Sequence, residues 1–303
     1  MIFLNSLNKQ ILFIINKFAG HGFDPKVEGK IIDQCANHGY ECTIEFTQGK
    51  GHATLLAKEG IEKQFLKIIA VGGDGTVNEV AQAMIHQNIP MGIIPKGSGN
   101  GLSRHLGIPL HYSRALENAL TGKTVSVDTF LVNNRLSLNV SGVGFDGHIA
   151  NMFGKDGKRG LSGYAKLILK EFFSFHPFTL TISSTGTESK HRVFITAFAN
   201  SSQYGNNAKI APLASVQDGK LDVMLIEKIS PWQSISFLQK MLSGNIHQSS
   251  LCEYYSVNEL VCHTSKEMPY HIDGEASGYA QQFEIKVLPA SLKLIIPATV
   301  QVI

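Results

Sequence analysis

The stretch KIIAVGGDGT at residues 67–76 decides the fold, because an apolar, β-branched run passes directly into a turn that contains three glycines. We expect a strand at 67–71 and a helix that starts with Thr76 as its N-cap. Glycines let backbone N–H groups approach a bound anion closely, and the helix N-terminus adds roughly half a positive charge. Asp74 stands beside that anion, where a carboxylate can hold a magnesium ion or accept a proton from a hydroxyl. Taken alone, the motif also fits a plain tight turn in which Asp74 is a cap.

The stretch PKGSGNG at 95–101 repeats this design after the next expected strand. It offers a hydroxyl at Ser98 and an amide at Asn100, and Arg104 follows closely. For Arg104, a phosphate contact and a solvated helix charge are both open. The carboxyl ends of neighbouring parallel strands meet at one edge of a sheet, so we expect two phosphate-binding turns side by side. Neither is a Walker A sequence, because G-x-x-x-x-G-K-[ST] does not occur where a strand meets a helix.

The fold class follows from the pattern of strand-like and helix-like segments around these loops. Short β-branched runs alternate with helical patterns over the first 120 residues, which predicts a parallel sheet flanked by helices. From about Thr124 the pattern becomes alternating and strand-like, which predicts a β-sandwich. We expect strands at 11–16, 40–46, 67–71 and 91–95, with helices at 25–38, 52–59, 76–87, 99–106, 162–173 and 231–242. The expected domains are an α/β nucleotide-binding domain at 1–123, to which 294–303 is a candidate addition, and a β-sandwich domain at 124–293, with the active site in the cleft between them.

Composition limits the class of protein. The chain has 303 residues, of which 43% are hydrophobic and 17% charged, with a net charge of +3 that is not gathered into basic runs. Nucleic acid is therefore not the expected partner. The four cysteines form no C-x-x-C pair, which favours reduced thiols in the cytoplasm. The N-terminal residues lack a cleavage site and favour a first strand over a signal peptide, and no apolar run reaches the roughly 20 residues of a membrane-spanning helix.

Two motifs lie in the second half of the chain. HIDGE at 271–275 reads in isolation as an Asp-Gly turn, but next to two phosphate-binding loops its carboxylates can close an active site. GVGFDG at 142–147 matches the dinucleotide pattern G-x-G-x-x-G. No second strand with a terminal acidic residue follows it at the right distance, so we do not expect a Rossmann site there.

The ordered set GGDGT, PKGSGNGLSRHLGIP, GFDG, NAKIAPLASVQDGKLDV and HIDGE resembles the diacylglycerol kinase catalytic family, which includes bacterial lipid kinases and the sphingosine and ceramide kinases. The resemblance covers nearly the whole chain. It implies an ATP-dependent lipid kinase that uses Mg²⁺ and meets its lipid as a peripheral protein at the inner membrane surface. Diacylglycerol, a sphingoid base, ceramide and monoacylglycerol are all open as substrates, and so is a homodimer.

The resemblance also implies roles for individual residues. Asp74 and Glu275 are the implied catalytic carboxylates, with their division of labour open, and Asp74 also contacts metal. Asp146 corresponds to a position that contacts lipid hydroxyls, and Asp218 to one that binds a structural magnesium. The implied nucleotide contacts are Asn16, Gly20, Thr47, Gly72, Gly73, Gly75, Thr76, Ser98, Asn100, Arg159 and Gly274.

One departure from the family pattern shifts the expected chemistry. Many bacterial members have an aspartate where this chain has Gly101, which places more weight on Asp74 and Glu275. Two other functions stay open at this point. One is a kinase of a soluble substrate such as NAD, because GGDGT occurs there too, and the other is a non-catalytic sensor that binds nucleotide or lipid.

Overall fold

The computed structural model describes residues 9–20, 22, 24–153, 161–184 and 187–301, and the chain divides into two units. The first unit comprises Met1–Val127 together with Ser291–Gln301. The second comprises Asp128–Ala290 with Val302–Ile303. The segment that follows the second unit therefore returns to the first. Among the described residues, no helix is both long enough and apolar enough to cross a membrane.

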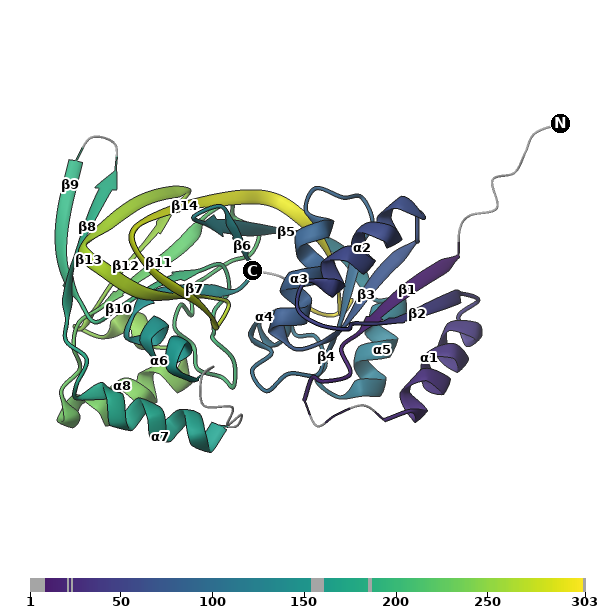
Figure 1. Cartoon of the computed structure of the whole chain (residues 1–303), viewed down its shortest axis with the longest axis horizontal. Coiled ribbons are helices and arrows are strands. Elements are labelled where there is room, and N and C mark those ends of the chain that lie inside the picture. Colours follow the sequence, from purple (N-terminus) through teal and green to yellow (C-terminus); the bar gives the residue numbers. More distant parts are fainter. Residues whose placement is uncertain (1–8, 21, 23, 154–160, 185–186, 302–303) are drawn as a thin grey trace. The chain divides into compact units, whose positions relative to one another are not determined.

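The first unit is built on a parallel sheet, as predicted (Figure 1). Its strands run in the order β2-β1-β3-β4, and the end of β14 adds to β4 through the pair Leu294 and Met91. Strands β1, β3 and β4 are almost continuously apolar because helices cover both faces of the sheet, whereas β2, at the sheet edge, alternates polar and apolar residues. The strand bounds are β1 (Gln10–Ile15), β2 (Glu41–Phe46), β3 (Lys67–Gly72), β4 (Met91–Pro95) and β14 (Glu275–Ile296).

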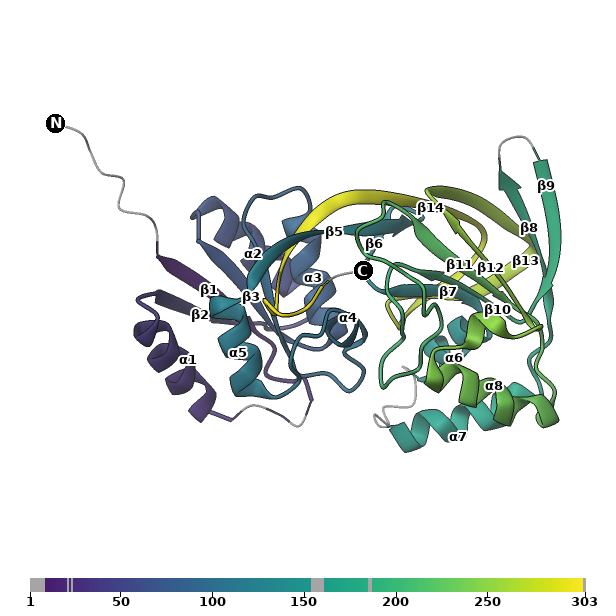
Figure 2. The ribbon, with the colours of Figure 1, turned by 180° about the vertical axis from the view of Figure 1, so that it is seen from behind.

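Alternate residues of each strand meet helices on opposite faces of this sheet (Figure 2). Phe13 shares a core cluster with Ile31 of α1 and Leu116 of α5. On the other face, Gly60 of α2 lies directly against Leu12. The helices are α1 (Lys26–Asn37), α2 (His52–Glu62), α3 (Asp74–Met84), α4 (Gly101–His105) and α5 (Tyr112–Thr121), of which α5 was not predicted.

The predicted start of α3 was wrong. The N-cap is Gly73, in an extended conformation, and the helix begins at Asp74. Thr76 is thus already in the first turn, and its hydroxyl accepts a hydrogen bond from the Asn16 side chain (3.0 Å). The consequence is that Asp74 itself belongs to the helix N-terminus.

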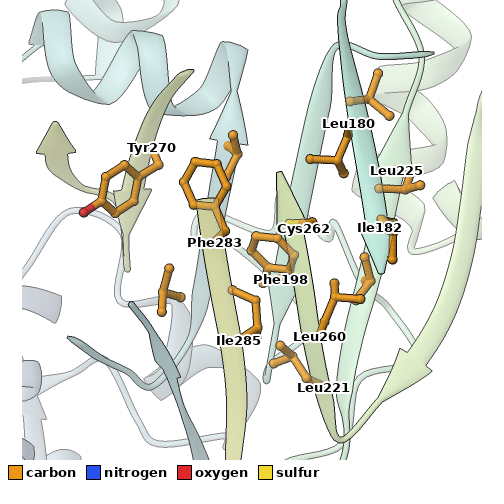
Figure 3. Packing of buried hydrophobic residues seen from close by; sticks show 14 of the residues in the cluster. Leu180, Ile182, Phe198, Leu221, Leu225, Leu260, Cys262, Tyr270, Phe283 and Ile285 are labelled. Atoms are coloured by element: carbon orange, nitrogen blue, oxygen red, sulfur yellow. The ribbon is translucent and has the colours of Figure 1, made fainter. Parts of the chain in front are cut away.

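The second unit is β-sandwich-like, as predicted. Its main path β12-β11-β10-β7-β13-β14 pairs antiparallel at every step, and the β8-β9 hairpin adds to β13. Buried side chains such as Phe198, Leu260 and Phe283 fill the interior (Figure 3). The remaining strands are β5 (Lys123–Val132), β6 (Arg135–Ser137), β7 (Val140–Gly144), β8 (Phe178–Ser184), β9 (Thr187–Val193), β10 (Ile195–Ala199), β11 (Leu221–Ile226), β12 (Cys252–Val257) and β13 (Glu259–Ile272).

Three helices gather along one side of the second unit, where both views show them as neighbours (Figures 1 and 2). Phe237 of α8 packs on the β10 and β11 side chains, and Phe145 of α6 packs against Phe172 of α7. Ser230 and Gln233 form a capping box at the start of α8. The bounds are α6 (Phe145–Phe153), α7 (Leu161–Phe172) and α8 (Pro231–Ser243), followed by the short 3-10 helix η1 (Ile246–Gln248).

Candidate active site

Two glycine loops meet at the carboxyl edge of the first unit's sheet. Gly72 at the end of β3 pairs with Pro95 at the end of β4, and the Lys96 N–H donates to the Gly72 carbonyl (2.7 Å). A Cβ added to Gly97 would lie 2.8 Å from the Gly73 Cα, so the two loop backbones touch. The prediction that these loops lie side by side is confirmed. A side chain at position 97 would therefore force the two loops apart.

The Asp74 carboxylate ties the two loops together. Its Oδ2 accepts a hydrogen bond from the Asn100 N–H (2.9 Å), and its Oδ1 accepts one from the Gly101 N–H (3.1 Å). Asn100 takes a left-handed conformation, with φ of 51°, which turns both amides toward Asp74. Gly101, which stands where many bacterial members have an aspartate, is buried and supplies one of these amides. The carboxylate is thus fixed by two charge-assisted hydrogen bonds.

Asn100 has a structural part in the same loop. Its side-chain Oδ1 accepts from the Gly97 N–H (3.0 Å), and its Nδ2 donates to the Gly97 carbonyl (2.7 Å). The side chain is buried. Arg104 donates from Nε to the Gly99 carbonyl (3.0 Å), so it also braces this loop. Ser98, at the tip, is exposed.

A third turn, after β1, joins the two loops. Asn16 donates to Thr76, as described above, and a Cβ on Gly20, whose φ is +64°, would lie 2.3 Å from the Lys96 carbonyl oxygen. The Lys96 ammonium reaches back to the Gly22 carbonyl (2.6 Å), and burial lowers the pKa of Lys96. We call this assembly the loop junction: Asn16–Gly20, Gly72–Thr76 and Lys96–Gly101. It brings together the predicted residues Asn16, Gly20, Gly72, Gly73, Asp74, Gly75, Thr76, Ser98 and Asn100.

Thr47 and Glu79 lie beside the loop junction. Thr47 makes a backbone hydrogen bond there, whereas Glu79 acts through its side chain. Thr47 follows β2, is buried, and donates its N–H to the Ile15 carbonyl (2.9 Å) at the end of β1. Glu79, in the second turn of α3, accepts from the Gly51 N–H (2.8 Å) and the Ala53 N–H (3.3 Å) at the start of α2. Its carboxylate therefore caps a helix, a role that the sequence pattern did not reveal.

In the second unit, the HIDGE turn is anchored by its first two polar residues. Asp273 and Gly274 both have positive φ, as a two-residue hairpin turn requires. Asp273 Oδ1 accepts from the Ser137 hydroxyl (2.6 Å) and the Asn139 N–H (2.9 Å), and its Oδ2 accepts from the Leu138 N–H (3.0 Å). Glu275 follows this turn with an exposed side chain. The turn is thus a rigid support for one exposed carboxylate.

Asp146 belongs to a buried network beneath the same turn. Its Oδ2 accepts from the Tyr204 hydroxyl (2.8 Å) and from His271 Nε2 (3.0 Å), and its Oδ1 accepts from the Gly147 N–H (2.8 Å). The Gly274 N–H donates to His271 Nδ1 (3.1 Å), which leaves Nε2 as the ring nitrogen that contacts Asp146. Only 10% of the Asp146 side chain is exposed.

Gly142 explains the G-x-G-x-x-G match. A Cβ at Gly142 would lie 2.1 Å from Asp146 Oδ2 and 3.0 Å from His271 Nε2. The glycine therefore makes room for this network. Its strand, β7, has antiparallel neighbours, whereas a dinucleotide site needs a parallel βαβ unit.

We expect Asp146→Asn to lower the free energy of unfolding by about 2 kcal/mol, because it leaves buried donors without a charged acceptor. Tyr204→Phe, which removes a single bond to the same oxygen, should cost about 1 kcal/mol. Urea unfolding followed by circular dichroism measures both. If Asp146→Asn unfolds at the same urea concentration as the unmodified protein, the hydrogen bonds of Asp146 do not stabilise the fold.

The remaining predicted residues lie elsewhere. Asp218 is exposed, and its Oδ1 accepts from the Lys220 N–H (3.0 Å) within its own turn. Asp128, which is buried and was not predicted, holds this turn through the Gly219 N–H (2.7 Å) and also accepts from the Ala290 N–H (2.7 Å). Arg159 lies outside the described residues.

The family resemblance implies that the protein binds magnesium. Within the described part of the chain, no three His, Cys, Asp or Glu side chains cluster closely enough to hold a metal ion. Magnesium, however, keeps several waters and is commonly bound by one or two carboxylates plus substrate phosphates. A single carboxylate, such as Asp74 beside the glycine turns, fits that mode of binding.

Comparison with known proteins gives matches over most of the chain. Residues 10–132 match the family model for the diacylglycerol kinase catalytic domain, and residues 140–296 match the model for the YegS C-terminal NAD kinase beta sandwich-like domain. A probable lipid kinase YegS-like of Chromohalobacter salexigens is 27% identical over 265 residues, with 86% of this chain and 85% of that protein covered. A diacylglycerol kinase of Bacillus subtilis is 27% identical over 281 residues, with 89% and 91% covered. The fold is similar to that of a putative diacylglycerol kinase from Bacillus anthracis, with a TM-score of 0.79 at 24% identity over 96% of this chain and 99% of that one.

Proposed function

Because the chain belongs to the diacylglycerol kinase catalytic domain family, we propose that it is a lipid kinase that transfers the γ-phosphoryl group of ATP to a hydroxyl of diacylglycerol or a related lipid. The observation that carries the proposal is the loop junction, where three turns at the carboxyl ends of β1, β3 and β4 surround one fixed carboxylate. Phosphoryl transfer depends mainly on positioning and on charge stabilisation, and this edge of the sheet offers both.

The loop junction supplies hydrogen-bond donors for the nucleotide phosphates. Gly73, the N-cap of α3, has no side chain, and no side chain caps the helix. The first-turn amides of α3 and its dipole therefore favour an anion at this end. The glycines at 73 and 75 are partly exposed and leave the backbone accessible there. We assign to this turn, with Ser98 of the second loop, the binding of the phosphates of ATP.

Asp74 is the residue that we assign to the metal. Magnesium bound to the phosphates would neutralise charge on the transferring group. The protein's own part is to hold the Asp74 carboxylate still, which the amides of Asn100 and Gly101 do. A preorganised carboxylate costs no reorganisation when charge develops beside it.

The lipid hydroxyl needs a proton acceptor, and two carboxylates qualify. Asp74 is held in the first unit, whereas Glu275 is exposed on the anchored HIDGE turn of the second unit. The anchoring through Asp273 supports a catalytic part for the turn, because a catalytic group must be held within a narrow range of positions. We propose that these two carboxylates share the roles of general base and metal ligand.

Incubation of the purified protein with radiolabelled ATP, Mg²⁺ and mixed micelles tests the proposal. The micelles carry diacylglycerol, monoacylglycerol, ceramide or sphingosine, and NAD is supplied separately as a soluble acceptor. We expect label in one of the lipids and loss of transfer when EDTA removes the metal. Label on NAD alone, or nucleotide binding without turnover on every acceptor, would contradict a lipid kinase.

A further inference from the structure

The outward face of α8 is apolar. Trp232, Ile235, Leu238 and Leu242 are spaced by three, three and four residues, which places them on one face of the helix. They are 93%, 69%, 49% and 50% exposed. Such a row is unlike the polar outer face of an ordinary surface helix. Scattered single apolar residues need no explanation, but a contiguous row indicates a binding surface.

The opposite face of α8 packs in the hydrophobic core. Phe237 is buried and Met241 is partly buried, and both pack in a cluster with β10 and β11 side chains such as Ala197 and Ile226. The helix is therefore anchored on one side and apolar on the other. If α8 rotated to bury its exposed apolar residues, Phe237 and Met241 would become exposed instead. The fold therefore keeps the apolar outer face of α8 exposed.

The neighbouring helix α7 and the residue after it extend this surface. Lys166, Leu169, Lys170 and Phe173 share one face by their spacing and are exposed, whereas Ile168 packs inward. The two helices run side by side in both views (Figures 1 and 2). Phe173, just beyond α7, and Pro231, at the start of α8, line one surface pocket of about 590 Å³. We call the two outer faces together the helix-pair surface.

The charges around the helix-pair surface are mainly positive. Lys240 is the one ionisable residue in the sequence of α8. On α7, the Glu171 carboxylate is paired with His148 (3.0 Å) and Lys170 (3.7 Å), and its side chain is 13% exposed. The pocket between the helices is lined by two cations, Arg192 and Lys228, against one acid, Glu227.

An anionic bilayer fits this combination. Helices that lie in a membrane interface bury an apolar face with Trp, Phe and Leu, and place Lys and Arg at the level of the head groups. Tryptophan prefers this boundary, and each nearby cation adds about 1 kcal/mol on an anionic surface. The pattern contains all three elements: Trp232 at the helix start, an aliphatic row behind it, and lysines beside it.

We infer that the helix-pair surface is the membrane-docking surface of this protein, and that its partner is the head-group region of an anionic lipid bilayer. The inference rests on the proposed lipid kinase function, since a water-soluble substrate would give no reason for docking. It adds to that function the part of the molecule that holds the enzyme on the membrane. No residue of the helix-pair surface belongs to the loop junction or to the HIDGE turn, so docking and chemistry are separable.

Trp232 is the one tryptophan of the chain and reports directly on docking. Phosphatidylglycerol vesicles, added without ATP or diacylglycerol, should shift its emission to shorter wavelength, and brominated acyl chains should quench it. Phosphatidylcholine vesicles should bind on the order of tenfold more weakly, because the cations lose their partners. Unchanged emission with both vesicle types would overturn the inference, whatever the kinase assay shows.

Ile235→Ser with Leu238→Ser removes the middle of the row. We expect this variant to partition onto phosphatidylglycerol vesicles at least about tenfold more weakly in sedimentation, because two apolar side chains no longer leave water. Ile32→Ser with Leu55→Ser is the matched control, with residues 53% and 55% exposed on helices of the other unit, and it should bind like the unmodified protein.

Two further results would count against docking. Equal binding of the patch variant and its control would remove the helix-pair surface as the contact. A shift in Trp232 emission that depends on protein concentration and needs no vesicles would assign the surface to a second copy of the chain. If the protein binds vesicles but phosphorylates no lipid, by contrast, the proposed kinase function is contradicted and the docking inference is not. Phosphorylation of a short-chain, water-soluble diacylglycerol should be equal in the two serine variants.

Discussion

Asp74→Asn should lower the kcat of lipid phosphorylation by about 10²–10⁴-fold, the range typical of a lost acid–base or metal-binding carboxylate. The side chain accepts one backbone N–H on each oxygen, from Asn100 and Gly101. In the variant, an amide NH₂ faces one of these N–H groups, so a hydrogen bond is replaced by a donor facing a donor. We therefore expect the free energy of unfolding to fall by about 1–3 kcal/mol as well. Steady-state kinetics and urea unfolding measure the two effects.

Glu79→Gln separates chemistry from stability. Glu79 lies on the same helix α3 and also accepts two backbone N–H groups, from Gly51 and Ala53. Its loss should cost about 0.5–2 kcal/mol as a lost helix cap, while kcat stays within a few-fold of the unmodified value. If both variants lose activity only in proportion to the unfolded fraction, Asp74 has a structural role alone. Full activity of Asp74→Asn would remove it from the mechanism.

Gly97→Ala should lower kcat/KM for ATP by on the order of 10²-fold, because displacement of binding groups by about 1 Å has that effect. The added Cβ would lie 2.8 Å from the Gly73 Cα and 2.8 Å from Asn100 Oδ1. One of these neighbours is backbone and cannot rotate away, so the two loops must separate. Nucleotide titration and initial rates would both report the change.

Gly29→Ala is the matched control for that change. Gly29 lies within α1, and a Cβ there meets nothing within 4 Å. The substitution should leave kinetics unchanged and stabilise the protein by about 0.5–1 kcal/mol, because alanine is the better helix former. Unaltered kcat/KM in Gly97→Ala would show that the contact between the loops is not needed for nucleotide binding.

In the first unit, β3 and β4 could be predicted closely because each is an apolar run that ends in glycine or proline. The second unit was harder. The segments 259–264 and 268–273 each have the sequence pattern of a separate strand, but they form one strand, β13, whose pairing is irregular between His263 and Met268. Charged residues at that irregularity interrupt the alternation of apolar and polar residues. The sequence pattern therefore suggests two strands, although the structure has one continuous strand. Helix α6 was not predicted because it directly follows a strand with a glycine-rich end.

The parts of the site that depend on local motifs could be predicted, whereas those that depend on backbone conformation could not. The contact between the two glycine loops follows from neighbouring strand ends. The position of Asp74 depends on the left-handed conformation of Asn100, which directs two amides at one carboxylate. Similarly, Thr76 is a favourable cap by composition, but its hydroxyl is taken by a side chain 60 residues away.

The return of residues 291–301 to the first unit affects how the protein is made. Ile295 belongs to the same core cluster as β1 and β3 residues, and its carbonyl accepts from the Asn118 side chain (3.4 Å). The Ser291 carbonyl likewise accepts from the His86 N–H (2.7 Å). During synthesis, the N-terminal half therefore emerges from the ribosome without the strand that completes it. Its sheet keeps an open edge at β4 until residues 291–296 have been translated, and in that interval the unpaired edge is exposed to association with other chains.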